Sequence, residues 1–119
     1  MNQKKILVVD DEASIQMLFE LALSLKGYEV ITSSSGEEAI EILDKESIFV
    51  MFLDLNLSGM TGIELFSKIM KITPITLAFA MGYSSHFELS DCKDTGFEDY
   101  YVKPVPLKEI IKAVSNAFT

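Results

Sequence analysis

The most constraining feature of the sequence is an apolar run, residues 48–53, that ends in a single carboxylate, Asp54. Six consecutive apolar residues, several of them β-branched or aromatic, are typical of a strand buried on both faces, as in a parallel sheet. A loop with Asn56 and Gly59 follows, and then Thr61-Gly-Ile-Glu64, a capping box that predicts the start of a helix. Ligands of parallel α/β sheets bind outside the carboxyl ends of the strands. Asp54 is therefore a candidate site residue.

The remaining strands are predicted from shorter runs that alternate with segments of helical periodicity. They are residues 6–9, 29–32, 75–80 and 98–102. Five strands alternating with five helices predict an α/β fold, a five-stranded parallel sheet with helices on both faces. The first, third and fourth strands are apolar throughout and belong in the centre, whereas the second and fifth are mixed and belong at the edges. The order 2-1-3-4-5, which is doubly wound and flavodoxin-like, satisfies this.

The predicted helices have apolar residues at helical spacing and recognisable ends. In the first helix, Ile15, Leu18, Ala22 and Leu25 lie at helical spacing. Gly27 is predicted to end this helix, and Pro106 to lie in the first turn of the last helix. Residues 81–84 are predicted to form the loop after the fourth strand, and a weakly amphipathic helix that ends before Gly96 is expected to follow.

Length and composition narrow the class of protein. The 119 residues predict one domain, spanning residues 1–119. A net charge of −8 argues against unaided binding to nucleic acid or to an anionic membrane. No apolar stretch has the length of a membrane span, and the N-terminus lacks the pattern of a signal peptide. Cys92 is the single cysteine, so no internal disulfide is possible and a cytoplasmic location is expected.

The predicted strand order brings four charged side chains to one crevice. Asp10 and Asp11 follow the first strand, Asp54 ends the third, and Lys103 follows the fifth. Converging carboxylates repel one another, and Mg²⁺, a hard cation with oxygen ligands, relieves that repulsion. Lys103 is suited to contact a phosphoryl oxygen, and Asp54 is a plausible nucleophile that would carry a phosphoryl group as an acyl phosphate. Together these residues predict a phosphoryl-transfer site.

Each of these motifs also has a simpler explanation. The pair Asp10-Asp11 is a suitable cap for the first helix, and Lys103-Pro104 suits an ordinary turn. The occurrence of acidic or basic residues at the carboxyl ends of three strands favours one shared site. His86 is a lone histidine and is expected to be inert.

With these residues in view, the chain from Lys5 to Phe118 resembles a receiver domain of the response-regulator family. The matching residues are Asp10-Asp11, Asp54, the loop Leu57-Ser-Gly-Met-Thr-Gly62 and Lys103-Pro104. The resemblance implies a phosphoacceptor domain of a two-component phosphorelay, in which Asp54 receives a phosphoryl group from a histidine kinase or phosphotransfer protein. It implies signalling to a downstream partner through the helix before Gly96, the strand 98–102 and the last helix.

The resemblance also implies roles for single residues. Mg²⁺ would be bound directly by Asp11, Asp54 and the carbonyl of Asn56, with Asp10 acting through water. Lys103 would contact the phosphoryl group and form a cis peptide with the proline that follows it. Asn56 and Tyr83 would flank the approach of the hydrolytic water. Tyr101 would be the aromatic residue that turns inward on activation.

Two departures from the family pattern stand out. Ser58 replaces a loop proline, and Met81 occupies the position at the end of the fourth strand where the family has a threonine or serine. A register slip would place Ala80 there, which has no hydroxyl either. Thr76 comes too early in the strand, and Ser84 would require a rearranged loop. Met81 therefore predicts weak coupling between phosphorylation and the partner-binding face.

Two alternative functions follow from these departures and motifs. A degenerate receiver would bind partners without needing phosphorylation, and Met81 is the observation in its favour. An aspartate-nucleophile phosphatase is suggested by Asp54-Leu-Asn56, but Asn56 cannot act as the general acid/base that this group requires. No glycine-rich phosphate loop is present, so nucleotide hydrolysis is not indicated. The protein is therefore not expected to be an enzyme.

Overall fold

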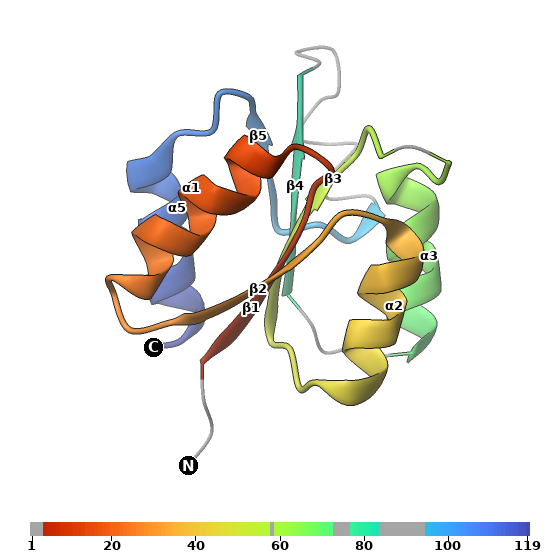
Figure 1. Ribbon diagram of the computed structural model, residues 1–119, viewed down its shortest axis with the longest axis horizontal. Helices are drawn as coiled ribbons and strands as arrows, with labels where there is room; N and C mark the ends of the chain where they lie inside the picture. Colours follow the sequence, from red (N-terminus) through yellow and green to blue (C-terminus); the bar gives the residue numbers. More distant parts are fainter. Residues whose placement is uncertain (1–3, 58, 73–76, 84–94) are drawn as a thin grey trace.

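The computed structural model describes residues 4–57, 59–72, 77–83 and 95–119. Its five strands are β1 (Lys5–Val9), β2 (Glu29–Ser33), β3 (Val50–Asp54), β4 (Leu77–Gly82) and β5 (Asp99–Val102). The described helices are α1 (Ala13–Ser24), α2 (Gly36–Lys45), α3 (Gly62–Ile72) and α5 (Leu107–Ala117). All strand pairs are parallel, and the order β2-β1-β3-β4-β5 confirms the predicted topology (Figure 1). The helix predicted before Gly96, with His86 and Cys92, lies outside the described residues.

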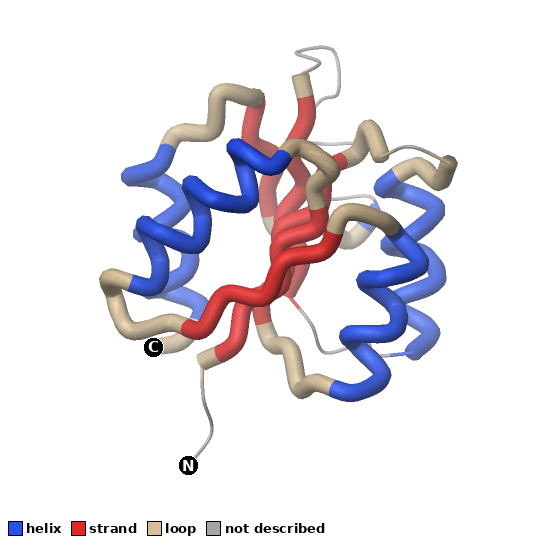
Figure 2. Tube along the Cα trace, viewed as in Figure 1, coloured by secondary structure: helices blue, strands red, loops and turns tan. Residues whose placement is uncertain are grey.

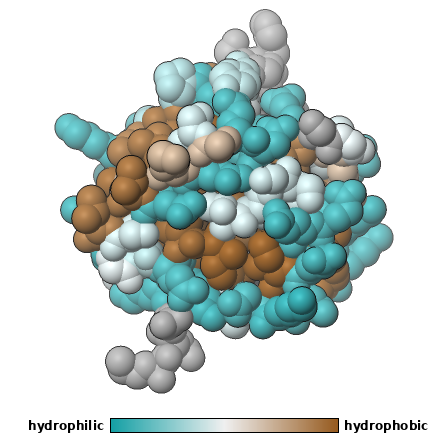
Figure 3. Space-filling view, viewed as in Figure 1, coloured by the Kyte–Doolittle hydropathy of each residue, from teal (hydrophilic) through white to brown (hydrophobic). Residues whose placement is uncertain are grey.

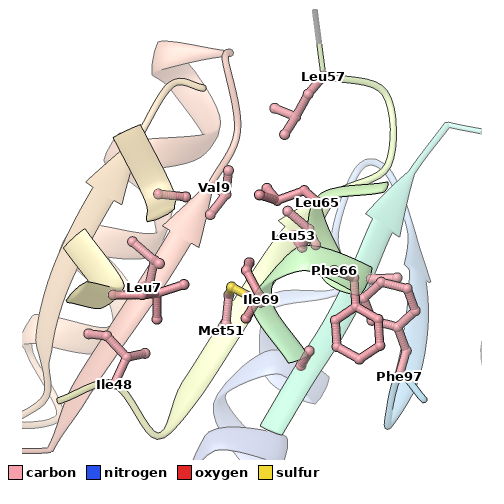
Figure 4. Packing of buried hydrophobic residues seen from close by; sticks show 14 residues of the cluster. Leu7, Val9, Ile48, Met51, Leu53, Leu57, Leu65, Phe66, Ile69 and Phe97 are labelled. Carbon is pink, nitrogen blue, oxygen red and sulfur yellow. The ribbon is translucent and has the colours of Figure 1, made fainter. Parts of the chain in front are cut away.

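Helices cover both faces of the sheet, as predicted. α1 and α5 lie on one face and α2 and α3 on the other (Figure 2). Because side chains alternate along a strand, β1 and β3 contribute to two separate cores. Leu7 and Met51 pack toward α2 and α3, as Figure 4 shows, whereas Val8 and Phe52 pack toward α1 and α5. This explains why residues 48–53 are apolar without alternation.

The helix starts are fixed by local hydrogen bonds that the sequence predicts. The hydroxyl of Ser35 accepts from the amide of Glu38 at 3.1 Å, and the hydroxyl of Thr61 accepts from the amide of Glu64 at 3.1 Å. Gly62 lets α3 begin against the end of β3, since a Cβ there would lie 2.6 Å from the Asp54 carbonyl oxygen. The loop after Asp54 is therefore held close to the strand.

The apolar residues predicted at helical spacing in the first helix lie on both its faces: Ile15 packs against the core, but Leu18 and Leu25 do not. Phe19 and Leu23 are fully buried in α1, whereas Leu18 is 36% exposed and Leu25 is 85% exposed. α1 contains two apolar stripes at helical spacing, and the stripe that is buried contains Phe19, whose ring lies 5.0 Å from that of Phe52. Gly27, with a φ of 90°, ends the helix as predicted.

The second apolar stripe of α1 faces outward. We call it the α1 strip, and it consists of Met17, Leu18, Leu21 and Leu25. Figure 3 shows a hydrophobic patch over α1 on the left of the view. Glu20 is the only charged residue of α1. The described residues contain no helix with the length and apolar character of a membrane span.

Two predicted boundaries are also wrong. Met81 and Gly82 belong to β4 and not to the following loop, because they pair with β3 and β5. Pro106 is the N-cap of α5 and lies one residue before its first turn. Its extended backbone, with a ψ of 94°, places the start of the helix at Leu107.

Candidate functional site

The acidic residues predicted to converge lie together at one end of the sheet. Asp10 directly follows β1, and Asp54 is the last residue of the neighbouring β3. Carboxylate oxygens of Asp10, Asp11 and Asp54 all lie within 4.8 Å of one another. Asp10 and Asp54 are buried, and Asp11 is exposed. The site therefore has two buried acids beneath one that is open to solvent.

The carboxylates of Asp10 and Asp54 each accept a hydrogen bond from the backbone amide two residues further along the chain. Oδ1 of Asp10 accepts from the amide of Glu12 at 2.9 Å, and Oδ1 of Asp54 accepts from the amide of Asn56 at 2.9 Å. In each residue this bond orients the carboxylate so that Oδ2 faces Lys103.

Lys103 lies at the centre of the site with a side chain that is 1% exposed. Its Nζ lies 2.7 Å from Oδ2 of Asp10, 3.0 Å from Oε1 of Glu12 and 3.4 Å from Oδ2 of Asp54. Its backbone amide donates to the carbonyl of Gly82 at 2.8 Å. The Lys103-Pro104 peptide is cis, which confirms the expectation from the resemblance.

Burial and charge oppose each other in this site. Burial by itself lowers the pKa of Lys103, but the close contacts with Asp10 and Glu12 and the charges of Asp10 and Asp54 raise that pKa above its usual value. Lys103 is therefore an ammonium ion. Burial raises the pKa of Asp10, and the close contact with Lys103 and the hydrogen bond from the Glu12 amide offset part of that shift.

The carboxylates have the chemistry of a site for a hard divalent cation. Oδ2 of Asp10 is buried and paired with Lys103, yet no hydrogen bond of good geometry reaches it. A buried acceptor in this position is incompletely satisfied by the protein alone. Oxygen donors from Asp10, Asp11 and Asp54 match the preference of Mg²⁺ for carboxylate ligands. The residues present therefore fit a magnesium ion.

No role was predicted for Glu12, but the structure places it in the site. Its carboxylate accepts the Tyr83 hydroxyl at 2.7 and 2.9 Å and a hydrogen bond from Lys103 at 3.0 Å. These two contacts, the tyrosine hydroxyl foremost, lower the pKa of Glu12. The Tyr83 ring centroid lies 5.0 Å from Nζ of Lys103. A third acid directly after Asp10-Asp11 was the available signal, but its partners are 71 and 91 residues away.

Comparison with known proteins agrees with this geometry. The sequence model of the response regulator receiver domain matches residues 6–115. The chain belongs to the response regulator receiver family. It is 30% identical to sporulation initiation phosphotransferase F of Bacillus subtilis, over 98% of this chain and 94% of that protein. It is 38% identical to a probable transcriptional regulator, ycf27, of Porphyra purpurea, over 92% of this chain but only 45% of that protein. The receiver chain thus spans less than half the length of several relatives.

Solved structures show the same fold. The response regulator TrrA of Thermotoga maritima, in complex with Mg²⁺-BeF, is 30% identical with a TM-score of 0.85, over 97% of this chain and 99% of that one. A CheY-like receiver domain of Methanospirillum hungatei is 26% identical with a TM-score of 0.88, over 97% of this chain and 93% of that one.

Met81 lies beside Asp54, the predicted phosphoacceptor. Met81 pairs with Asp54 in the β3–β4 register and with Tyr101 in the β4–β5 register. Met81 and its neighbour Ala80 are fully buried at this strand end. Neither side chain has a hydroxyl. Ser58, Thr76 and Ser84 lie outside the described residues.

Tyr101 points into the core between the sheet and α5. It is 8% exposed, and its ring lies 6.2 Å from that of Phe79 and 6.5 Å from that of Phe52. Burial, with smaller contributions from the charges of Asp99 and Glu109, raises the pKa of Tyr101 to about 12. Met81 belongs to the same buried cluster, so the two side chains share one part of the core.

Proposed function

We propose that this receiver domain accepts a phosphoryl group on Asp54 from the phosphohistidine of a histidine kinase or phosphotransfer protein. The observation that carries the proposal is the position of Asp54, whose carboxylate lies 3.4 Å from Lys103 and beside Asp10 and Asp11. An oxygen of Asp54 attacks the phosphorus, the P–N bond breaks, and its electron pair stays on the imidazole nitrogen. The product is an acyl phosphate on Asp54.

The residues of the chain support this transfer by charge and position. Lys103 is fixed as an ammonium ion beside the attacking carboxylate, where it would neutralise charge on the phosphoryl oxygens. Asp11, Asp54 and the carbonyl of Asn56 would hold Mg²⁺, with Asp10 acting through water. When bound, Mg²⁺ supplies further charge neutralisation to the transferring group.

Partner binding is proposed at two surfaces. The α1 strip lies on the helix that begins at Ala13, directly after Glu12. A protein donor must bring its histidine to Asp54, so we propose that it covers the α1 strip. The output face would include β5 and α5, which flank a groove of about 500 Å³. Phe79 and Tyr101 contribute to the lining of this groove, and Glu98, Asp99 and Glu109 are acidic residues in it.

A degenerate receiver is the second candidate. The pairing of buried Met81 with Asp54 favours it, because the hydroxyl that the family provides there is missing. In that case the domain would bind its partner without phosphorylation. A phosphatase is not favoured, because Asn56 supplies no carboxylic acid. We therefore propose a phosphoacceptor and not an enzyme, and the acidic net charge gives no support to direct nucleic-acid binding.

Incubation with acetyl phosphate and Mg²⁺, followed by mass spectrometry, tests the function. We expect one added phosphoryl group, mapped to Asp54, and none in Asp54→Asn, which keeps the shape but removes the anionic nucleophile. A labile phosphate in Asp54→Asn would refute the assignment of Asp54. An unmodified wild-type domain would favour the degenerate receiver.

A further inference from the structure

Lys103 is already paired with three carboxylates before any new group binds. An ammonium ion has three N–H donors, and three carboxylates already lie within 3.4 Å of Nζ. These carboxylates belong to Asp10, Glu12 and Asp54. The proposed function requires Lys103 to contact phosphoryl oxygens as well. A phosphoryl oxygen would therefore compete with three carboxylates for one ammonium group.

The three carboxylates differ in how easily they can release the lysine. The side chains of Asp10 and Asp54 are 0% and 3% exposed, whereas that of Glu12 is 36% exposed. A buried carboxylate that loses its cation is left unpaired at a large energetic cost. Glu12 can exchange Lys103 for water. Glu12 is therefore the partner that Lys103 releases at the lowest cost.

A phosphoryl group would drive this release electrostatically. It replaces the single negative charge of the Asp54 carboxylate with about two and adds three acceptor oxygens. The phosphoryl oxygens then compete with Glu12 for Lys103, and the added charge repels the Glu12 carboxylate. Both effects act in the same direction on one movable side chain.

Glu12 also connects Lys103 to Tyr83. Both oxygens of the carboxylate accept the Tyr83 hydroxyl, at 2.7 and 2.9 Å, and the Tyr83 ring lies over Lys103. Tyr83 is 61% exposed, while the lysine side chain beneath it is 1% exposed. The ring thus covers the ammonium group. Tyr83 follows Gly82 at the end of β4, where a Cβ on Gly82 would lie 2.9 Å from the Tyr100 hydroxyl, so the backbone beneath the ring is closely packed.

We propose that Glu12 is a positioning residue of the phosphoryl-transfer site. Without a phosphoryl group, Glu12 binds Lys103 together with Asp10 and Asp54 and also accepts the Tyr83 hydroxyl. When Asp54 carries a phosphoryl group, Lys103 binds the phosphoryl oxygens in place of Glu12. Glu12 then moves into solvent, and Tyr83 loses its hydrogen-bond acceptor. This inference rests on the proposed function. In this way Tyr83, at the end of β4, would respond to phosphorylation without a hydroxyl at position 81.

Tyrosine-ring NMR with beryllofluoride, a mimic of the phosphoryl group, tests the proposal. Tyr83→Phe identifies the Tyr83 resonance, because that signal disappears. In the wild-type domain, beryllofluoride with Mg²⁺ should shift the Tyr83 resonance. In Glu12→Gln the resonance should already be displaced toward the bound position without ligand. The half-saturating beryllofluoride concentration should also fall about 3- to 10-fold, since Lys103 is no longer shared with an anion.

Glu20→Gln is the matched control. It removes the same charge within α1, whereas Glu12 is the N-cap of that helix, and Glu20 is exposed and makes no contact with Lys103 in the described residues. It should leave both the Tyr83 resonance and the half-saturating concentration close to wild type. Equal effects of Glu12→Gln and Glu20→Gln would overturn the proposal, because the response would then be one of net charge.

The experiment separates failure of this inference from failure of the proposed function. If beryllofluoride binds and the Tyr83 resonance does not move, the role of Glu12 and Tyr83 is refuted and the phosphoacceptor function stands. If beryllofluoride does not bind and acetyl phosphate adds no mass, the phosphoacceptor function fails and the inference fails with it.

Discussion

Met81 and Asp54 lie directly opposite each other in neighbouring strands, and the amide of Leu55 donates to the Met81 carbonyl at 2.9 Å. Met81 is in turn opposite Tyr101 on the next strand. The three residues form one row across the carboxyl end of the sheet. The residue between Asp54 and Tyr101 is thus a buried thioether, which is only a weak acceptor.

We predict that Met81→Thr strengthens the coupling between Asp54 and Tyr101. A threonine hydroxyl can donate to a charged phosphoryl oxygen, which contributes about 1.5–3 kcal/mol. Amide spectra with and without beryllofluoride should show small shifts at Tyr101 and α5 in the wild type and larger shifts in Met81→Thr. The smaller side chain should lower the free energy of unfolding by about 1–3 kcal/mol.

Met81→Val is the matched control for this experiment, because valine has nearly the shape of threonine but no hydroxyl. It should lose similar stability without gaining the larger shifts. Large shifts that already reach Tyr101 in the wild type, and that do not grow in Met81→Thr, would contradict the prediction.

We predict that Mg²⁺ stabilises the folded domain. The acidic cluster of Asp10, Asp11 and Asp54 exists only in the native state, so a bound cation stabilises that state by about 1.4 kcal/mol at ten times its dissociation constant. Thermal melts with millimolar Mg²⁺ should therefore show a midpoint a few degrees higher. Glu41→Ala, a change at an exposed acid of α2, should keep this shift, and Asp11→Ala should lose it. A shift that survives Asp11→Ala would count against the site.

The sheet order could be predicted because the chain separates its strands by polarity. β1, β3 and β4 are almost entirely buried, while β2 and β5 are only partly buried at the edges. Once that order was assigned, the meeting of Asp10 and Asp54 followed from strand ends alone. Topology, and not side-chain detail, therefore carried the prediction of the site.

The features that the sequence did not predict depend on tertiary contacts. α1 has two apolar stripes of equal helical spacing, and only packing against Phe52 selects the one that contains Phe19. The last two residues of β4 are strand because of their pairing partners and not because of their own propensity. The contact of Glu12 with Tyr83 joins residues 71 positions apart through side-chain geometry, which no local pattern encodes.

We predict that Leu21→Glu slows phosphoryl transfer from a protein donor by about tenfold or more, the effect of a loss of about 1.4 kcal/mol or more of binding free energy. Leu21 is 63% exposed in the α1 strip, so the substitution should not disturb the core. Transfer from a phosphorylated donor protein and reaction with acetyl phosphate should be measured side by side. The acetyl phosphate reaction should keep its wild-type rate, because the small donor does not need the strip.

Ile72→Glu is the matched control for the α1 strip. Ile72 is an apolar residue at the end of α3, on the other face of the sheet, and is 49% exposed. The Ile72→Glu variant should accept the phosphoryl group at the wild-type rate from both donors. Equal rates of transfer from the protein donor to Leu21→Glu and Ile72→Glu would show that the α1 strip does not contact the donor.

We predict that the domain loses stability between pH 10 and pH 12 through Tyr101. The pKa of Tyr101 is raised to about 12, above the value of about 10 for an unfolded tyrosine, so the native state keeps its proton longer. This contribution is fully present below pH 10 and is lost as the pH rises through 12. At pH 11 the free energy of unfolding should be about 1.4 kcal/mol lower, through Tyr101, than it is below pH 10. Denaturant unfolding at pH 9 and pH 11 should therefore show a smaller loss of stability in Tyr101→Phe than in the wild type. An equal loss in the two proteins would mean that the Tyr101 phenol is not held protonated by its burial beside Phe79.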